Sequence, residues 1–276
     1  MLALGLAVVF SVLGMINFAH GDLMTLSGYA YVGATLSGAP FFLAVLAALA
    51  AGTLAAILLE RIAFRPLRDA GPMTLLITSF AVSIVLHTLF QNLISPRPQP
   101  AVMPSVLSEA ISLGHFLIGS IQATSILVTA AMLLLLVYLF RKTTLGMSIR
   151  AAAMDFTTTR LMGLRADMVI SASFGLSGLL AAVSGILWIA QRGSVDPLMG
   201  VFPVVKAFIA AILGGLGSLP GAVVGGFALG SIEIALQSLL PITILPFKDP
   251  LALLIVIGIL MKFPNGLIPV KQSGRP

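Results

Sequence analysis

Three polar residues interrupt an apolar stretch close to the start of the chain. Asn17, His20 and Asp22 lie within GMINFAHGDLM, between the apolar runs LALGLAVVFSVL and TLSGYAYVGATLSG. Imidazole and carboxylate groups are typical of acid–base catalysis and of metal sites, but no nucleophile and no further ligand accompanies these three. Two interpretations stay open: a polar break between two helices, or the lining of a path through the protein.

The first interpretation gives each residue of the stretch a structural task. Asp22 is expected to cap the following helix, because its oxygen can accept from N–H groups of the first turn, while Gly21 lets the chain bend. Asn17 and His20, three residues apart, then face one way and satisfy backbone groups exposed at the break. Under the second interpretation the same side chains contact a passing solute.

Other residues of catalytic type form no recognisable enzyme site. His20, His87 and His115 are scattered, and no serine has a Gly-x-Ser-x-Gly context. The segment GGLGSLPG, residues 214–221, lacks the Gly-Lys-Ser/Thr ending of a phosphate loop and has Pro220 where a dinucleotide fingerprint needs glycine. We interpret it as a tight turn between two helices, and we expect no catalytic residue, metal or cofactor in this chain.

Two charged residues lie in apolar segments on either side of that turn. Lys206 and Glu233 are 11 and 16 residues from Gly217, an offset of five residues or about 7.5 Å of helical rise. A lysine side chain spans most of that offset, and an ionisable group in a membrane persists only when it is paired or faces water. The spacing therefore predicts a buried ion pair, with a role in a transport path as the alternative.

A polar stripe runs along the segment 73–94. Ser79, Ser83, His87 and Gln91 recur every four residues among Ile, Val, Leu and Phe, which places them on one face of a helix. That face either lines a wet path or makes hydrogen bonds to a neighbouring helix.

The elements that position these residues are membrane-spanning helices. Of the 276 residues 59% are hydrophobic and only 9% are charged, whereas soluble domains carry about a quarter charged residues. We predict one transmembrane domain over residues 1–276, an all-α polytopic bundle of eight to nine membrane segments in contact with lipid. The apolar segments lie near 2–19, 22–38, 41–60, 73–94, 122–140, 168–190, 202–216, 221–240 and 250–262.

Basic residues between these segments predict the orientation of the chain. Eleven of the 15 Lys and Arg residues lie in 61–68, 141–165 and 262–275, so these regions are expected to be cytoplasmic. The net charge of +6 is thus a topology signal and does not indicate a nucleic-acid partner. The segment 95–121 becomes an extracytoplasmic loop whose prolines favour extended chain. No removable signal peptide is expected.

Small residues predict close helix packing in two places. Ser171, Gly175, Gly178, Ala182 and Gly185 form a stripe along one helix face, where another helix can approach. The segment GAVVGGFALG contains two Gly-x-x-x-Gly pairs, Gly221 with Gly225 and Gly226 with Gly230.

The connector at 141–167 is rich in Ala and Met with spaced charges, in MSIRAAAMDFTTTRLMGL. This composition is typical of short amphipathic helices with an apolar face and a charged rim. Such a helix either lies on the membrane surface or docks in a groove of another protein, and the residues themselves leave both interpretations open.

Four motifs in this order resemble one family of transport proteins. GMINFAHGDLMTLSGY, RAAAMDFTTTRLMGL, ILGGLGSLPGAVVGG and the closing FPNGL are similar to LivH-type permeases of bacterial branched-chain amino acid ABC transporters. The resemblance runs over nearly the whole chain. It implies a multi-pass inner-membrane subunit of about eight helices that pairs with a second permease, two cytoplasmic ATPases that bind ATP and Mg, and a periplasmic binding protein that delivers leucine, isoleucine or valine.

The resemblance also implies a role for the cytoplasmic connector. The alanine-rich residues match the coupling segment that ABC permeases insert into a cleft of the ATPase, which favours docking over a surface linker. The residues that match are Arg150, Ala151, Ala152, Asp155 and Gly163. Family members usually carry another apolar stretch ahead of NFAHG, whereas sixteen residues precede Asn17 here.

Three other functions remain alternatives. The same family includes permeases for urea and short amides. A proton-coupled secondary transporter would use Asp22, His20 or Glu233 as the proton carrier. A channel is disfavoured by the tight glycine packing and the long cytoplasmic connector.

Overall fold

The computed structural model describes residues 1–68, 70–104, 110–113, 116–154, 159 and 166–268. Helices dominate the described chain, because apolar segments in a membrane must satisfy their backbone hydrogen bonds internally. Each of the nine segments predicted from hydrophobicity corresponds to a helix. The helices are α1 (Leu2–Leu13), α2 (His20–Leu36), α3 (Phe41–Leu59), α4 (Pro72–Leu89), α5 (Ser120–Lys142), α6 (Thr144–Met154), α8 (Ala166–Arg192), α9 (Val201–Gly214), α10 (Leu219–Leu239) and α11 (Lys248–Lys262).

Five helical stretches of the described chain are long and apolar enough to cross a membrane. They are Phe41–Leu67, which extends α3 through a π turn and a 3-10 turn, then Pro72–Ile94, Ser120–Lys142, Asp167–Arg192 and Leu219–Leu239. The all-α polytopic membrane fold is therefore confirmed. The number of eight to nine full spans stays a prediction, since α1, α2, α9 and α11 are only 12 to 17 residues long.

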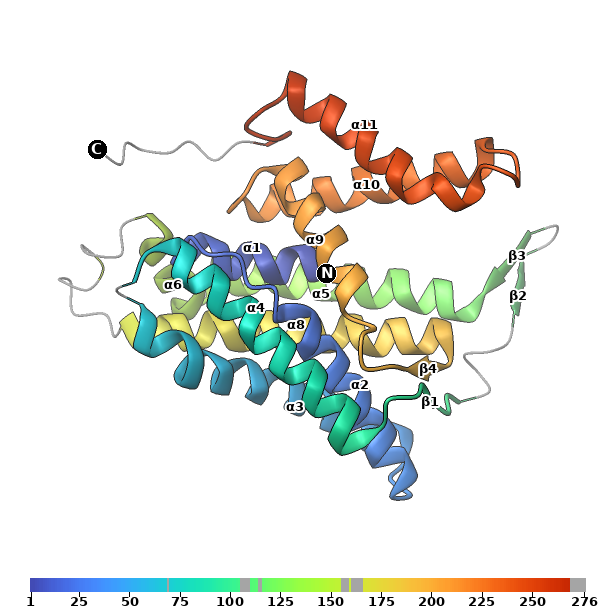
Figure 1. Cartoon of the computed structure of the whole chain (residues 1–276), viewed down its shortest axis with the longest axis horizontal. Coiled ribbons are helices and arrows are strands. Elements are labelled where there is room, and N and C mark those ends of the chain that lie inside the picture. Colours follow the sequence, from blue (N-terminus) through green and yellow to red (C-terminus); the bar gives the residue numbers. More distant parts are fainter. Residues whose placement is uncertain (69, 105–109, 114–115, 155–158, 160–165, 269–276) are drawn as a thin grey trace.

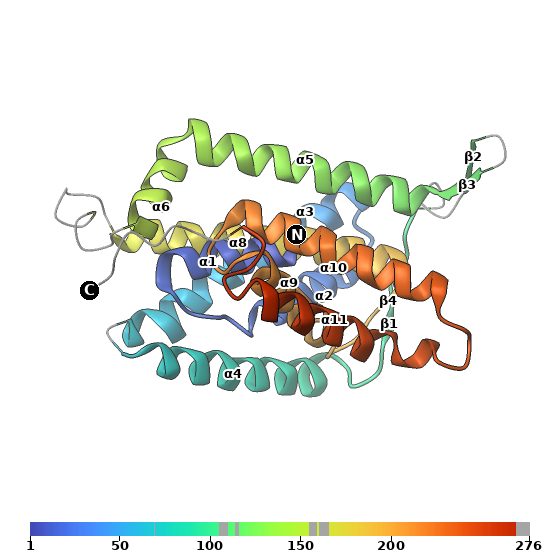
Figure 2. The same ribbon diagram turned by 90° about the horizontal axis from the view of Figure 1, so that it is seen from above.

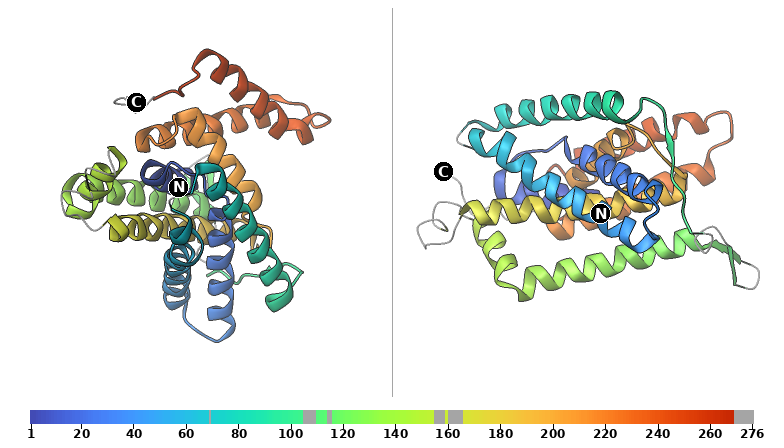
Figure 3. Two further views of the ribbon diagram at one scale, coloured as in Figure 1. Left: turned by 60° about the vertical axis from the view of Figure 1, so that its left-hand side comes forward. Right: turned by 90° about the horizontal axis from the view of Figure 1, so that it is seen from below.

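Helix α8 is the central element of the bundle (Figure 1). In the 18-residue apolar stretch of each helix, 67% of α8 is buried inside the protein, against 11% of α5 and 17% of α4. Figure 2 shows α5 and α4 on opposite flanks of the layer that contains α8, α1 and α10. In the left view of Figure 3, α10 and α11 (orange to red) form one side of the bundle and α2 and α3 (blue) the opposite side.

The connectors gather at two ends of the molecule. The α3–α4 connector, the α5–α6 corner and the turn between α9 and α10 lie at the left end in Figure 1. Arg65 and Arg68 of the α3–α4 connector both contact Asp167 at the start of α8. Two of the basic regions predicted to be cytoplasmic thus lie side by side, as a shared membrane side requires.

The opposite end carries the predicted extracytoplasmic loop and four short strands (right in Figure 1). The described part of 95–121 contains β1 (Gln99–Pro100), β2 (Ala110–Leu113) and β3 (Phe116–Gly119), which confirms extended chain over helix there. Strands β2 and β3 form an antiparallel hairpin, and β1 pairs with β4 (Ser194–Val195) after α8. The pairing of β1 with β4 anchors the loop to the end of the central helix.

Candidate functional site

The predicted break between the first two helices is confirmed, and it lies deep in the bundle. Helix α1 ends because Gly14 adopts left-handed backbone with φ 64°, and its N–H donates to the Phe10 carbonyl at 2.8 Å. Helix α2 begins at His20, whose Nδ1 lies 3.1 Å from the Ser177 hydroxyl. Ser177 is the twelfth of the 27 residues of α8, a helix about 40 Å long. The break therefore lies near the middle of the central helix.

The expected capping role of Asp22 is wrong. Ala19 is the N-cap of α2, no side-chain cap bond is made there, and Asp22 is already in the first helical turn. The Asp22 Oδ1 atom instead lies 2.6 Å from His87 Nε2 on α4. The carboxylate turns away from its own backbone because a neighbouring helix offers an imidazole, a partner that local sequence does not reveal.

Gly21 also has a different task from the one expected. It lies within α2, and a Cβ on Gly21 would collide with the carbonyl oxygen of Gly200, while a Cβ on Gly200 would collide with that of Gly21. Gly200 is the N-cap of α9. The glycine therefore permits close approach between the starts of two helices, α2 and α9, and does not supply a bend.

Asn17 does not satisfy backbone groups with its side chain, contrary to expectation. Its backbone carbonyl accepts from the N–H of His20 at 3.3 Å. The side chain is only 2% exposed, and neither its amide oxygen nor its amide nitrogen has a hydrogen-bond partner among the described residues. His20 likewise bonds to the Ser177 side chain and not to the break. Asn17 is therefore a buried amide whose hydrogen-bonding capacity is unused by the protein.

The polar stripe of α4 faces the break at two of its four positions. The Ser79 hydroxyl accepts from the N–H of Phe18 at 3.3 Å and donates to the Leu76 carbonyl at 2.7 Å, and His87 contacts Asp22. The ring of Phe18 stacks on Phe80 with centroids 4.2 Å apart. Ser83 is half-buried, whereas Gln91 is exposed. The prediction that the stripe faces the interior holds for Ser79 and His87 and is wrong for Gln91.

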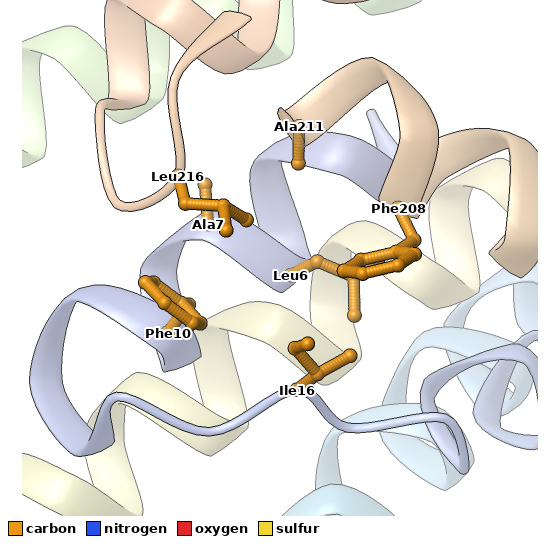
Figure 4. Close-up of a pocket in the computed structure, with 7 residues that line it drawn as sticks. All are labelled: Leu6, Ala7, Phe10, Ile16, Phe208, Ala211 and Leu216. Carbon is orange, nitrogen blue, oxygen red and sulfur yellow. The ribbon is translucent and has the colours of Figure 1, made fainter. Parts of the chain in front are cut away.

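A shallow apolar recess opens beside the break (Figure 4). It lies between α1, the residue Ile16 of the break, α9 and the turn that follows α9. Phe208, which lines it, also packs on Phe18 with ring centroids 5.7 Å apart. The lining residues are Leu6, Ala7, Phe10, Ile16, Phe208, Ala211 and Leu216.

A charged cluster that the sequence did not predict joins α3 to α8. Glu60, fully buried, accepts from Arg68 and, at 2.6 Å, from the hydroxyl of Ser171 on α8. Arg68 also contacts Asp167, which Arg65 contacts as well. The partners are up to 111 residues apart along the chain, so no local pattern signals the cluster. The sequence singled out Ser171 only as part of the small-residue stripe, and Arg65 and Arg68 only as basic residues that signal orientation.

The predicted ion pair between Lys206 and Glu233 is confirmed with an Nζ–Oε1 distance of 2.9 Å. Two features differ from the prediction. Asp249 of α11 is a third member, 3.0 Å from the same ammonium. The side chains of Lys206 and Glu233 are 37% and 25% exposed in this chain, so the pair is only partly buried. The turn between α9 and α10 brings the first two together, while α11 supplies the third.

Most of the predicted glycine contacts are confirmed. A Cβ on Gly178 would collide with Gly52 and Ala56 of α3, and one on Gly185 would lie 2.7 Å from the Met24 carbonyl oxygen of α2. Gly175, where a Cβ would lie 3.2 Å from Ile57, completes the stripe on α8.

The second glycine region behaves differently at its two pairs. Substitution at Gly221 or Gly225 would clash with the backbone of α9, whereas a Cβ on Gly226 or Gly230 would meet nothing within 4 Å. The second Gly-x-x-x-Gly pair was therefore wrongly predicted to pack. Gly215 and Gly217 have φ of 110° and 80° and form the expected turn, which ends at the N-cap Ser218.

Comparison with known proteins decides the family of this chain. The family described as branched-chain amino acid transport system / permease component matches residues 1–263. The chain belongs to this family. The permease protein LivH of Escherichia coli K12 is 32% identical over 296 residues, covering 100% of this chain and 91% of the relative.

Two further relatives extend the comparison. The permease protein BraD of Pseudomonas aeruginosa is 31% identical, with 100% of this chain and 91% of the relative covered. A probable LivH protein of Methanocaldococcus jannaschii is 26% identical over 98% of this chain and 88% of the relative. No solved structure matches the chain. The resemblance to LivH-type permeases noted in the sequence is thus confirmed over the full length.

The connector expected to couple this permease to an ATPase is described only in part. Helix α6 turns its apolar side inward, where Ile149 and Ala152 are 1% and 3% exposed, while Arg150 is exposed and Ala151 half-buried. Asp155 and Gly163 lie outside the described residues. The described half of the connector therefore has the buried apolar side that its composition predicted, while its exposed side carries Arg150 together with the apolar side chains of Leu145, Met147 and Met154.

Proposed function

We propose that this chain is the transmembrane permease subunit of an ATP-driven importer of leucine, isoleucine and valine. The observation that carries the proposal is the end-to-end match to LivH and BraD, whose names describe high-affinity branched-chain amino acid transport permeases. The chain itself does no chemistry in this scheme. Its helices provide the path, and ATP is hydrolysed on separate subunits.

The assembly proposed here contains four kinds of subunit. A second permease completes the path, two cytoplasmic ATPases bind ATP and Mg, and a periplasmic protein delivers the amino acid. The permease lies in the bacterial inner membrane, with residues 95–121 on the delivery side and residues 141–167 on the ATPase side. The shared position of two basic connectors at one end of the bundle supports this orientation.

The coupling step is assigned to the connector 141–167. Arg150, Ala151 and Ala152 of α6, followed by Asp155 and Gly163, present the surface that enters the ATPase cleft. ATP closes the ATPase dimer, the connector moves as a rigid lever, and the spans rock between outward and inward access. The cluster of Glu60, Arg68 and Asp167 supports this assignment, since it ties the start of α8 to α3 directly after the connector.

The path is assigned to the α1–α2 break. Asn17, His20 and Asp22 lie there, and Ser79 and His87 of α4 contact the same region. We also assign Ser83, which lies between them on α4, to the path. Polar groups at this depth persist where they are paired or face a path. Their position halfway along α8 supports a role in translocation, because a solute that crosses the bundle must pass that level.

Reconstitution tests the proposal. The permease is assembled with its two ATPases, the second permease and the binding protein in proteoliposomes. Uptake of radiolabelled leucine is then measured with ATP supplied on the side that carries the ATPases. We expect uptake that stops with an ATPase variant unable to hydrolyse ATP and that continues when the proton gradient is dissipated. Uptake with the opposite dependence identifies a proton-coupled transporter, and uptake of urea without leucine identifies an amide permease.

A further inference from the structure

Three side chains at the start of α2, those of Asn17, His20 and Asp22, are buried and have hydrogen-bonding atoms without a partner among the described residues. Asn17 and Asp22 are each 2% exposed. Both amide atoms of Asn17, Nε2 of His20 and both carboxylate oxygens of Asp22 lack a hydrogen-bond partner among the described residues, although Oδ1 of Asp22 lies 2.6 Å from His87 Nε2 in an ion-pair contact. A buried polar atom without a partner is destabilising, and a protein retains such atoms chiefly where a ligand or water completes them.

The same place is the meeting point of two helix starts. Gly21 in the first turn of α2 and Gly200, the N-cap of α9, are in backbone contact, which only glycine at both positions allows. The start of a helix carries a partial positive charge and unpaired N–H groups, and so favours anions. Interrupted helices in transporters commonly aim such ends at an anionic group of the substrate near the middle of the membrane.

We propose that the start of α2 binds the charged end of an α-amino acid in transit. The Asn17 amide nitrogen, at the positive end of α2, donates to the carboxylate, and Asp22 Oδ2 accepts from the ammonium group. His87 holds the other Asp22 oxygen and so orients the free one. This inference rests on the proposed function, and it adds which group of the chain contacts which group of the substrate.

Asn17 and Asp22 flank the start of α2: Asn17 lies three residues before the helix and Asp22 is its third residue. The carboxylate and ammonium of an α-amino acid are attached to the same carbon, so a single molecule presents both groups at one place. A site with one donor set and one carboxylate fits a zwitterion better than a simple anion or cation.

The apolar recess provides the surface for the aliphatic side chain. It begins at Ile16, the residue before Asn17, and continues over Phe208 of α9. No polar side chain lines it. A polar end at Asn17 and Asp22 beside an apolar surface matches an aliphatic amino acid and does not match urea, which has neither charge nor alkyl group.

Substitutions that remove or invert the polar contact test the site in the reconstituted transporter. Asn17→Leu keeps the branched shape of the side chain without hydrogen-bonding atoms, and Asn17→Asp places a negative charge where the substrate carboxylate is expected. Both are expected to lower leucine uptake about tenfold or more, the effect of losing a hydrogen bond to a charged group. ATP hydrolysis stimulated by the binding protein should persist, because the site is remote from the ATPase contact.

The matched control is Thr25→Val. Thr25 is also fully buried on α2, one turn further on, but its hydroxyl donates to the Gly21 carbonyl of its own helix. Uptake by this variant should stay within about twofold of the unsubstituted transporter, because the lost hydrogen bond lies within α2 and the proposed site does not use it. If Asn17→Leu and Asn17→Asp import leucine as well as Thr25→Val does, the proposed site is wrong while the importer function stands.

A second measurement needs no substitution and decides the matter if the Asn17 variants fail to accumulate. The assembled transporter without its binding protein is heated in detergent with millimolar leucine, 4-methylpentanoate or 3-methylbutan-1-amine, which lack the ammonium and the carboxylate respectively. A specific ligand raises the melting temperature through its affinity for the folded state. We expect a rise with leucine only. No rise with leucine, or an equal rise with all three, overturns the inference.

Failure of the proposed function gives a different result. If the unsubstituted assembly imports none of leucine, isoleucine and valine, the importer assignment itself falls, whatever the Asn17 variants do. If it imports leucine and only the predictions for Asn17 fail, the proposed site is wrong and the importer assignment stands.

Discussion

Removal of the Glu60 carboxylate should weaken the junction between α3 and α8. This carboxylate is fully buried and accepts from both Arg68 and Ser171. Loss of one partner from a buried ion pair costs about 3–5 kcal/mol, since the other charge is left without compensation. Arg68 keeps Asp167 as a second partner, so the lower end of the range, about 3 kcal/mol, is expected for Glu60→Ala.

The assay is thermal stability of the detergent-purified transporter. The permease carries a fluorescent fusion, and the folded fraction after heating is measured by gel filtration. For a chain of this size each kcal/mol shifts the melting temperature by about 2–4 °C, so Glu60→Ala should lower it by about 6–12 °C. Arg61→Ala is the matched control, because Arg61 is the neighbouring residue and is exposed. Its loss should cost less than about 1 kcal/mol.

The double variant Glu60→Gln with Arg68→Met separates the ion pair from simple packing. Replacement of both charges removes the uncompensated guanidinium, so the double variant should be more stable than Glu60→Gln alone. The reasoning is refuted if Glu60→Ala melts at the same temperature as Arg61→Ala. It is also refuted if the loss of stability in the double variant equals the sum of the losses from Glu60→Gln and Arg68→Met alone.

Three further predictions concern packing, the ion triad and coupling. Gly178→Leu should lower the melting temperature and the yield of assembled transporter, because its side chain would collide with α3, whereas Gly226→Leu should leave both unchanged. Glu233→Ala should cost only about 1 kcal/mol of stability because Asp249 still pairs with Lys206, and further removal of Asp249 should cost more than the sum of the single changes. Asp155→Lys or Gly163→Trp should abolish uptake while the permease still reaches the membrane, as measured by transport and by membrane fractionation.

Each of these has a result that contradicts it. Equal melting temperatures of the Gly178 and Gly226 variants would show that the packing of α3 against α8 does not require glycine at position 178. Additive costs for Glu233 and Asp249 would show that they do not share Lys206. Normal uptake by both connector variants would remove the assignment of residues 141–167 to the ATPase contact.

The elements were predictable because their cause is local. Nine apolar runs each became a helix, and Gly215 and Gly217 formed the turn that GGLGSLPG predicts. The Lys206–Glu233 pair was also predictable, since a short turn places both residues at similar heights on adjacent helices. Asp249 was not, because its helix follows after a separate connector whose geometry no local pattern determines.

The candidate site was predictable in its location and not in its contacts. The polar residues of GMINFAHGDLM marked a helix break, and the structure has one there. Local rules made Asp22 a helix cap, but the carboxylate bonds to His87, 65 residues further along the chain. A capping interaction and an interhelical pair compete for the same oxygen atoms, and the neighbouring helix wins where it is close enough.

The amino-acid sequence by itself determined that this is a polytopic helical membrane protein, which of its segments form helices, and which of its residues are too polar for lipid. These properties depend on the length and hydrophobicity of each segment, since a membrane requires every spanning backbone to satisfy its own hydrogen bonds. Only the tertiary structure decided that Glu60 meets Ser171, that Gly21 meets Gly200, and that the Asn17 side chain has no hydrogen-bond partner in the part of the chain that is described. Such contacts arise from helices that are distant in sequence, and their packing depends on the shapes of both surfaces at once.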